Sequence, residues 1–368
     1  MTTPITQGGY SALNLRGWPF NIVPSEETAA VWVGRPEALH QLLMLLRSIS
    51  RVPASQIILL WAAYGAGKTH ALKHLQGLAR QHADLLPLYV ATPEGMRSFL
   101  DVYKAVIDSA LQAGTLEAAG RDLFTKIGSP GRTDLERALI RIGTLPLEAQ
   151  ETQTAISWLK ADKVSMRDLR DVAITRRLET TAHGVDALND LIQILQRNGA
   201  VKILLLLDEI QEIDQLDSKR RIEAVGGLHK VFDRNTEGLT MLLSFTTASQ
   251  PQVRRIIGDA LFDRRSEILA LPPISLQEGV ELVEGLISEW SIDPKKSPFP
   301  FERESINAVV ERIAAENRLL TPREVIRAFN AILRQALFDL EDGRIAIIDT
   351  SYAVDRLATS LSELTEDE

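Results

Sequence analysis

The segment that most constrains this chain is a glycine-rich turn between an apolar run and a helical pattern. The apolar run is Gln56–Trp61, and the turn that follows contains Gly65 and Gly67. Glycine backbones can curl so that successive N–H groups face phosphate oxygens, and a helix N-terminus adds partial positive charge. A strand, loop and helix in this order predict a phosphate-binding loop, in which Lys68 reaches the β- and γ-phosphates and Thr69 binds Mg²⁺.

The loop departs from the usual pattern at one position. Ala62 stands where the first glycine of such loops is usual, and a small residue there keeps the prediction intact. The residues expected to bind the nucleotide are those of the loop and the histidine directly after it, namely Tyr64, Gly65, Ala66, Gly67, Lys68, Thr69 and His70.

Two adjacent carboxylates follow a second apolar run, Val201–Leu207. A buried strand that ends in Asp208 and Glu209 is the partner that a phosphate-binding loop requires for hydrolysis. Asp208 is predicted to bind Mg²⁺, and Glu209 to position and deprotonate the attacking water. The alternative is a strand that simply ends in solvated acids.

Apolar runs and helical periodicities alternate along the first three quarters of the chain. Further strands are expected at Leu86–Thr92, Thr240–Thr246 and Ile268–Pro272. This alternation predicts an α/β fold, a parallel sheet with helices on both faces. A small helical lid domain is expected to follow, with helices at Leu276–Trp290, Glu304–Ala315 and Pro322–Phe338 and a short strand at Arg344–Ile348.

The predicted domain organisation begins with an N-terminal leader, whose aromatic patch Trp18-Pro19-Phe20-Asn21 is expected to pack on the body of the protein. A largely helical insertion separates the loop from the acidic strand. The expected boundaries are 1–33 for the leader, 34–273 for the α/β domain with its insertion at about 114–198, 274–350 for the lid, and 351–368 for a C-terminal helix and acidic tail.

Composition narrows the function classes. A net charge of −8 argues against a generally basic nucleic-acid coat, although one basic face stays compatible with it. With 0 cysteines there is no thiolate site, and the nearest histidine pair, His70 and His74, indicates helix surface or packing rather than a zinc site. No secretory signal or membrane-spanning run is apparent, so a soluble cytoplasmic protein is expected.

In order as well as in kind, these segments resemble the AAA+ superfamily of P-loop ATPases. The resemblance is to the initiator-like branch, which includes origin-recognition ATPases, and to bacterial transposition-helper and phage-defence ATPases. The leader LRGWPFNIVP is similar to the entry segment of such bacterial proteins. The resemblance implies that Gly34 and Arg35 contact adenine. It also implies a polar sensor 1 at the end of the fourth strand, at Thr247 or Thr246, with Thr247 preferred.

The same resemblance implies two arginine roles. An arginine finger completes the site of a neighbouring subunit, and Arg265 fits this place best, with Arg264 second. Arg323, in the segment Thr321–Glu324 that begins a lid helix, resembles the sensor 2 arginine that turns to the γ-phosphate. Plain alternatives are a solvated basic pair and an ordinary first-turn residue.

The resulting expectation is an ATPase that uses ATP and Mg²⁺ and self-associates into a ring or filament. Double-stranded DNA and an effector protein are the expected partners, in transposition or in defence against foreign DNA, and no membrane is involved. A protein-remodelling ATPase and a sensor-type signalling ATPase are the alternatives. Basic residues that could contact DNA phosphates, or simply be solvated, are Arg170, Arg176, Arg177, Lys219, Arg220 and Arg221.

Overall fold

The computed structural model describes residues 10–128, 131–199, 201–247, 249–316 and 319–365. The chain forms two compact units. The sheet unit comprises Leu42–Ala62 and Leu75–Ala270, and the helical unit comprises Met1–Gln41, Ala63–His74 and Leu271–Glu368. The helical unit therefore includes the glycine-rich loop together with segments from both ends of the chain.

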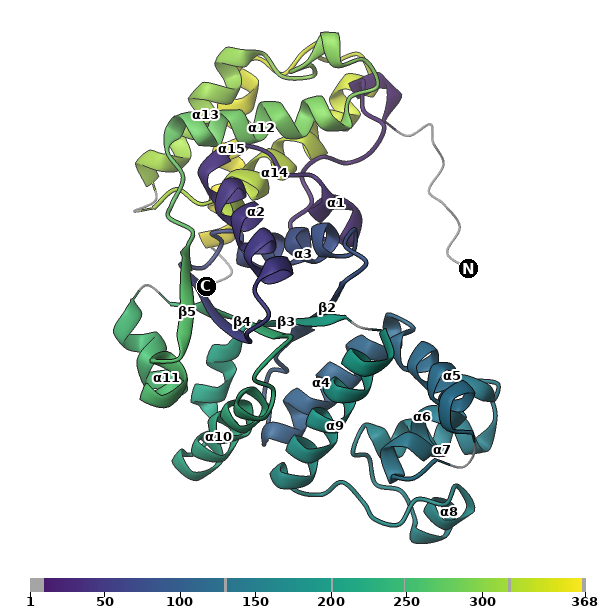
Figure 1. The fold of residues 1–368 in the computed structure, drawn as a ribbon. Helices are drawn as coiled ribbons and strands as arrows, with labels where there is room; N and C mark the ends of the chain where they lie inside the picture. Colours follow the sequence, from purple (N-terminus) through teal and green to yellow (C-terminus); the bar gives the residue numbers. More distant parts are fainter. Residues whose placement is uncertain (1–9, 129–130, 200, 248, 317–318, 366–368) are drawn as a thin grey trace. The chain divides into compact units, whose positions relative to one another are not determined.

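A five-stranded parallel sheet forms the centre of the sheet unit, in the order β2-β3-β4-β1-β5 (Figure 1). The α/β prediction is confirmed, and one strand begins earlier than expected, because Arg265 already pairs with Ile57. The strands are β1 (Gln56–Ala62), β2 (Leu85–Ala91), β3 (Lys202–Asp208), β4 (Leu239–Thr246) and β5 (Arg265–Ala270).

Helices cover the sheet and fill the long segment between β2 and β3. The segment at 114–198 was predicted to be largely helical, and the structure confirms this. The helices between β2 and β3 are α4 (Phe99–Gln112), α5 (Thr115–Ile127), α6 (Asp134–Thr144), α7 (Gln150–Leu159), α8 (Met166–Asp171) and α9 (Thr181–Gly199). The 3₁₀ turn η2 (Ile210–Gln215) and α10 (Ser218–Arg234) follow β3, and α11 (Gln250–Phe262) follows β4.

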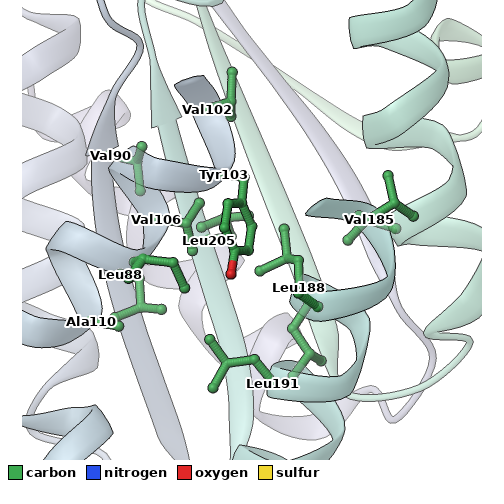
Figure 2. Close-up of a cluster of buried hydrophobic side chains, with 14 of the residues drawn as sticks. Leu88, Val90, Val102, Tyr103, Val106, Ala110, Val185, Leu188, Leu191 and Leu205 are labelled. Atoms are coloured by element: carbon green, nitrogen blue, oxygen red, sulfur yellow. The ribbon is translucent and has the colours of Figure 1, made fainter. Parts of the chain in front are cut away.

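Alternating residues of each strand face opposite sides of the sheet. One side supplies the main core, in which Leu88 and Val90 of β2 and Leu205 of β3 pack on α4 and α9. Figure 2 shows Tyr103 of α4 within this cluster, surrounded by aliphatic side chains. Tyr89 on β2 and Asp208 at the end of β3 belong to the other side of the sheet.

The helical unit has its own core. Phe20 of the leader is 1% exposed, and its ring packs 6.3 Å from Phe301 and 5.7 Å from Phe329. The aromatic patch of the leader therefore packs, as predicted. The elements are η1 (Ser11–Leu13), α1 (Glu26–Ala30), the first parts of α2 (Pro36–Arg51) and α3 (Lys68–Ala79), α12 (Leu276–Trp290), η3 (Pro294–Lys296), α13 (Arg303–Glu316), α14 (Pro322–Glu341) and α15 (Thr350–Thr365).

The strand predicted at Arg344–Ile348 is wrong. The chain turns sharply after α14, where the N–H groups of Arg344 and Ile345 both donate to the carbonyl of Asp339. Within this segment only Ile348 forms a β-bridge among the described residues, to Phe301. An apolar run becomes a strand only where a neighbouring strand accepts its hydrogen bonds, and here no such neighbour follows. Among the described residues, no helix is long and apolar enough to cross a membrane.

Candidate functional site

The glycine-rich loop begins directly after β1, at Ala63. Gly65 and Gly67 have φ angles of +79° and +94°, which side-chain-bearing residues rarely adopt. The Ala66 N–H donates to the Ala63 carbonyl at 3.2 Å, and α3 begins at Lys68. Lys68 is 5% exposed, and its Nζ donates to the Ala63 carbonyl at 3.3 Å. The lysine therefore folds back over the loop that precedes it.

Arg35 ties this loop to neighbouring backbone. Its guanidinium donates to the Ala66 carbonyl at 2.7 Å and also to the carbonyl of Pro272. Burial lowers the pKa of Arg35 from its ordinary value, and the Glu278 carboxylate opposes that shift. Gly34 and Arg35 both have positive φ, +64° and +46°, so the chain bends sharply at this position.

The N-terminus of α14 docks on the same loop. The Arg323 N–H donates to the Gly65 carbonyl at 3.2 Å, and the Arg323 guanidinium lies 4.3 Å above the ring of Tyr64. Thr321 caps the helix in a reciprocal pair with Glu324, which fixes where the helix begins. The predicted sensor 2 arginine is thus held against the loop, by contacts within the helical unit.

His70 and His74 line one side of α3. The His70 Nε2 lies 3.0 Å from the Val31 carbonyl and the His74 Nδ1 lies 2.8 Å from the Ala29 carbonyl, so these nitrogens carry the protons. Both rings pack on Trp32, at 5.4 and 5.1 Å. Burial, followed by the nearby His74, lowers the pKa of His70. Both histidines thus pack in this structure, and no cluster of metal-binding type occurs among the described residues.

Asp208 ends β3 in the sheet unit and is 1% exposed. Its Oδ2 accepts a hydrogen bond from the hydroxyl of Tyr89 on β2 at 3.0 Å, and its Oδ1 accepts the Glu209 N–H at 3.0 Å. A buried carboxylate needs such donors to replace the water that it loses. Asp208 is therefore an oriented carboxylate at the carboxyl end of the sheet.

Glu209 has a φ of +57°, and its carboxylate is held by two neutral donors. Thr246, the last residue of β4, donates its hydroxyl at 3.1 and 3.3 Å, and Gln211 donates its amide. The Gln211 Oε1 in turn accepts the Thr246 N–H at 2.9 Å. Thr247, the preferred sensor 1 residue, donates its hydroxyl to the side-chain oxygen of Gln252. It is Thr246 that reaches Glu209.

The two finger candidates are engaged within the sheet unit. Arg265 donates to the Phe262 carbonyl at 2.7 Å, and its guanidinium lies 4.1 Å above the Phe262 ring. Arg264 forms an ion pair with Asp233. Each would have to exchange these contacts to reach a neighbouring subunit.

The basic residues considered for DNA are partly neutralised. Arg221 pairs with Asp214 at 2.7 Å, and Arg220 pairs with Asp217 at 3.4 Å. Arg177 donates to the Val164 carbonyl at 2.8 Å. Arg170, Arg176 and Lys219 are exposed.

Two residues of this site escaped the sequence analysis, Tyr89 and Gln211. Tyr89 lies in a run read only as a buried strand, and Gln211 follows the carboxylate pair by two positions. A signal for Tyr89 existed, since a tyrosine within an apolar strand needs an acceptor for its hydroxyl. Which acceptor it finds depends on which strand lies beside β2.

A sequence model of one protein family matches residues 133–338, more than half of the chain. That family is described as BREX system ATP-binding protein BrxC/D. The matched segment contains Asp208 and Glu209 and ends within α14, whereas the glycine-rich loop lies before it. No curated protein matches the chain.

Solved structures show the same fold. The chain is similar to the ORC2 protein of Aeropyrum pernix in its ADPNP-ADP complexes, with 12% identity and a TM-score of 0.56, over 90% of this chain and 71% of that one. It is also similar to the Walker-type ATPase paby2304 of Pyrococcus abyssi, with 14% identity and a TM-score of 0.51, over 95% of this chain and 79% of that one. At such identities the likeness shows the fold alone.

Proposed function

Because the chain belongs to the family of BREX system ATP-binding proteins BrxC/D, we propose that it is a molecular switch driven by ATP hydrolysis. It is an ATP-binding AAA+ protein with an initiator-like fold. The reaction converts ATP to ADP and phosphate. One observation carries the proposal: a glycine-rich loop follows β1, and a buried aspartate with an adjacent glutamate ends β3.

The residues fit a nucleotide and a magnesium ion. Positive φ at Gly65 and Gly67 gives the loop the curl that directs N–H groups toward phosphate oxygens. Lys68 binds the β- and γ-phosphates, and Thr69 and Asp208 hold Mg²⁺, which neutralises charge on those phosphates when bound. The remaining nucleotide contacts are proposed at Gly34, Arg35, Tyr64, Ala66 and His70.

Glu209 is proposed to accept a proton from the attacking water. Its carboxylate is held by Thr246 and Gln211, so a proton acceptor with a defined orientation is present. The Arg323 guanidinium would leave its contact with the Tyr64 ring and bind the γ-phosphate instead. These side chains supply positioning and charge, which is most of what phosphoryl transfer requires.

The switch is proposed to act through self-association into a ring or filament. Arg265, or Arg264 in its place, would stabilise the negative charge in the site of a neighbouring copy. Double-stranded DNA and an effector protein are the proposed partners. The family assignment supports defence against foreign DNA as the setting, rather than transposition.

The test measures ATP hydrolysis and particle mass for the purified chain, Lys68→Ala and Glu209→Gln, each with and without double-stranded DNA. We expect Lys68→Ala to lose nucleotide binding, and Glu209→Gln to bind ATP, stop turning over and accumulate as a large assembly. Stimulation by DNA and capture of that assembly on DNA would support the DNA partner. If both variants hydrolyse ATP like the unaltered chain, the proposed site is wrong. If DNA changes neither rate nor mass, the DNA partner is wrong.

A further inference from the structure

The hydroxyl of Tyr89 meets Asp208 because of the register of β2 and β3. Ala91 pairs with Asp208, and Tyr89 pairs with Leu206, two residues earlier. Residues two apart in a strand share a face, so Tyr89 and Asp208 lie on the same side of the sheet. The 3.0 Å hydrogen bond joins the Tyr89 hydroxyl to Oδ2 of the carboxylate.

The rotation of the Asp208 carboxylate is restricted from both ends. Tyr89 holds Oδ2, and the backbone N–H of Glu209 holds Oδ1. At 1% exposure, Asp208 has little bulk water to replace a lost donor. Tyr89 therefore contributes directly to the fixed orientation of this carboxylate.

The donor is neutral, and this matters for a cation site. An arginine or lysine in place of Tyr89 would orient the carboxylate but also offset its charge. A tyrosine hydroxyl orients the carboxylate without adding a positive charge that would compete with a metal ion. Donors that orient the ligands of a metal in this way usually affect metal affinity.

A second tyrosine of the sheet unit provides the contrast. Tyr103 is fully buried beside the same two strands, and its hydroxyl has no hydrogen-bond partner among the described residues (Figure 2). Burial next to this sheet therefore does not by itself give a tyrosine hydroxyl a hydrogen-bond acceptor. The pairing of Tyr89 is a property of its place on the same face as Asp208, two residues before the position that pairs with it.

We propose that Tyr89 is a positioning residue for Asp208, which sets the affinity of the nucleotide site for Mg²⁺. The inference rests on the proposed function, since it assigns Asp208 to the metal. In this proposal Tyr89 acts through the aspartate, by its hydrogen bond to Oδ2.

The test compares Tyr89→Phe with Tyr103→Phe, because each removes one hydroxyl from a tyrosine of the same unit. ADP affinity is measured in EDTA and at increasing Mg²⁺, and ATP hydrolysis is followed over the same Mg²⁺ range. For Tyr89→Phe we expect ADP affinity in EDTA to be unchanged and the half-saturating Mg²⁺ concentration to rise about tenfold. At saturating Mg²⁺ most of kcat should return. Tyr103→Phe should leave all of these values unchanged.

Equal Mg²⁺ dependence in the two variants would overturn the proposal. A loss of ADP affinity in EDTA would also overturn it, because Tyr89 would then affect nucleotide binding without Mg²⁺. Adding Tyr89→Phe to Asp208→Asn should change Mg²⁺ dependence no further, and an additional shift would mean that Tyr89 acts elsewhere. Lys68→Ala tests the proposed nucleotide site separately from the proposed role of Tyr89. If Lys68→Ala still binds ADP, the nucleotide site is wrong, whatever the result for Tyr89→Phe.

Discussion

Two structural constraints require glycine at position 65 of the loop. Gly65 has a positive φ, and it also lies against the start of α14. A Cβ added there would lie 2.9 Å from the Thr321 Oγ1 and 3.0 Å from the Arg323 Cβ. Gly343 has a similar φ of +69°, yet a Cβ there would meet nothing within 4 Å. Substitutions at these two positions of the helical unit therefore distinguish the effect of backbone strain, which both share, from that of crowding, which only Gly65 has.

We predict that Gly65→Ala destabilises the protein more than Gly343→Ala and weakens nucleotide binding. Both variants carry the strain of a left-handed alanine, about 1–2 kcal/mol, and only the first also pushes α14 away from the loop. Chemical unfolding and ATP-binding measurements check this. Equal loss of stability with normal ATP binding in both variants would contradict the proposed role of the loop contact.

His70 makes folding depend on pH. Burial lowers its pKa in the folded protein below the ordinary value of 6.5, so the unfolded chain binds a proton before the folded one does. As pH falls from 6.5 toward the lowered value, the unfolded state gains protons and the free energy of unfolding decreases. Below the lowered value the dependence levels off.

His70→Gln should flatten this part of the stability profile, since glutamine can still donate to the Val31 carbonyl but does not titrate. His40→Gln, at an exposed position of α2, serves as the control. Denaturant unfolding between pH 5 and pH 8 provides the measurement. A slope that survives in His70→Gln would assign the pH dependence to another group.

At the scale of elements, α5 and α6 cross with almost no space between their backbones. A Cβ added to Gly120 would lie 1.9 Å from the Leu139 carbonyl oxygen, and one added to Gly143 would lie 2.4 Å from the Arg121 nitrogen. The close approach of these two helices in the insertion therefore depends on glycine at both positions. Helix propensity alone would favour alanine there.

Gly120→Ala should therefore lower stability, although alanine is the better helix former. Gly226→Ala is the matched control, because Gly226 lies within α10 and a Cβ there would meet nothing within 4 Å. That change should raise stability by about 0.5–1 kcal/mol. Thermal unfolding decides between them, and stabilisation by Gly120→Ala would show that the two helices can separate at little cost.

For the whole molecule, the net charge of −8 opposes both proposed associations. Copies of one acidic chain repel each other, and added salt screens that repulsion. Binding to DNA must instead use local basic residues that displace counterions from phosphates, which salt weakens.

Raising salt from about 50 to 200 mM should leave ATP-dependent self-association intact or strengthened, and should weaken DNA binding at least tenfold. Light scattering without DNA and anisotropy of labelled DNA measure the two separately. Self-association that collapses along with DNA binding would mean that contacts between copies are themselves mainly ionic.

Much of the fold followed from neighbours in the chain. The apolar runs of β1, β3 and β4 and the loop at Gly65 are local properties, so residue order alone located them. The strand expected at Arg344–Ile348 failed because strand formation needs a partner, and apolar residues alone do not provide one.

The sequence by itself determined that a glycine-rich loop follows one buried strand and that two carboxylates end another, because backbone freedom and strand period act over a few residues. Only the tertiary structure decided that Thr246 rather than Thr247 reaches Glu209, and that Tyr89 holds Asp208. Those pairings depend on which strands lie side by side and in which register. No local pattern contains that information, because it arises from the packing of the whole sheet.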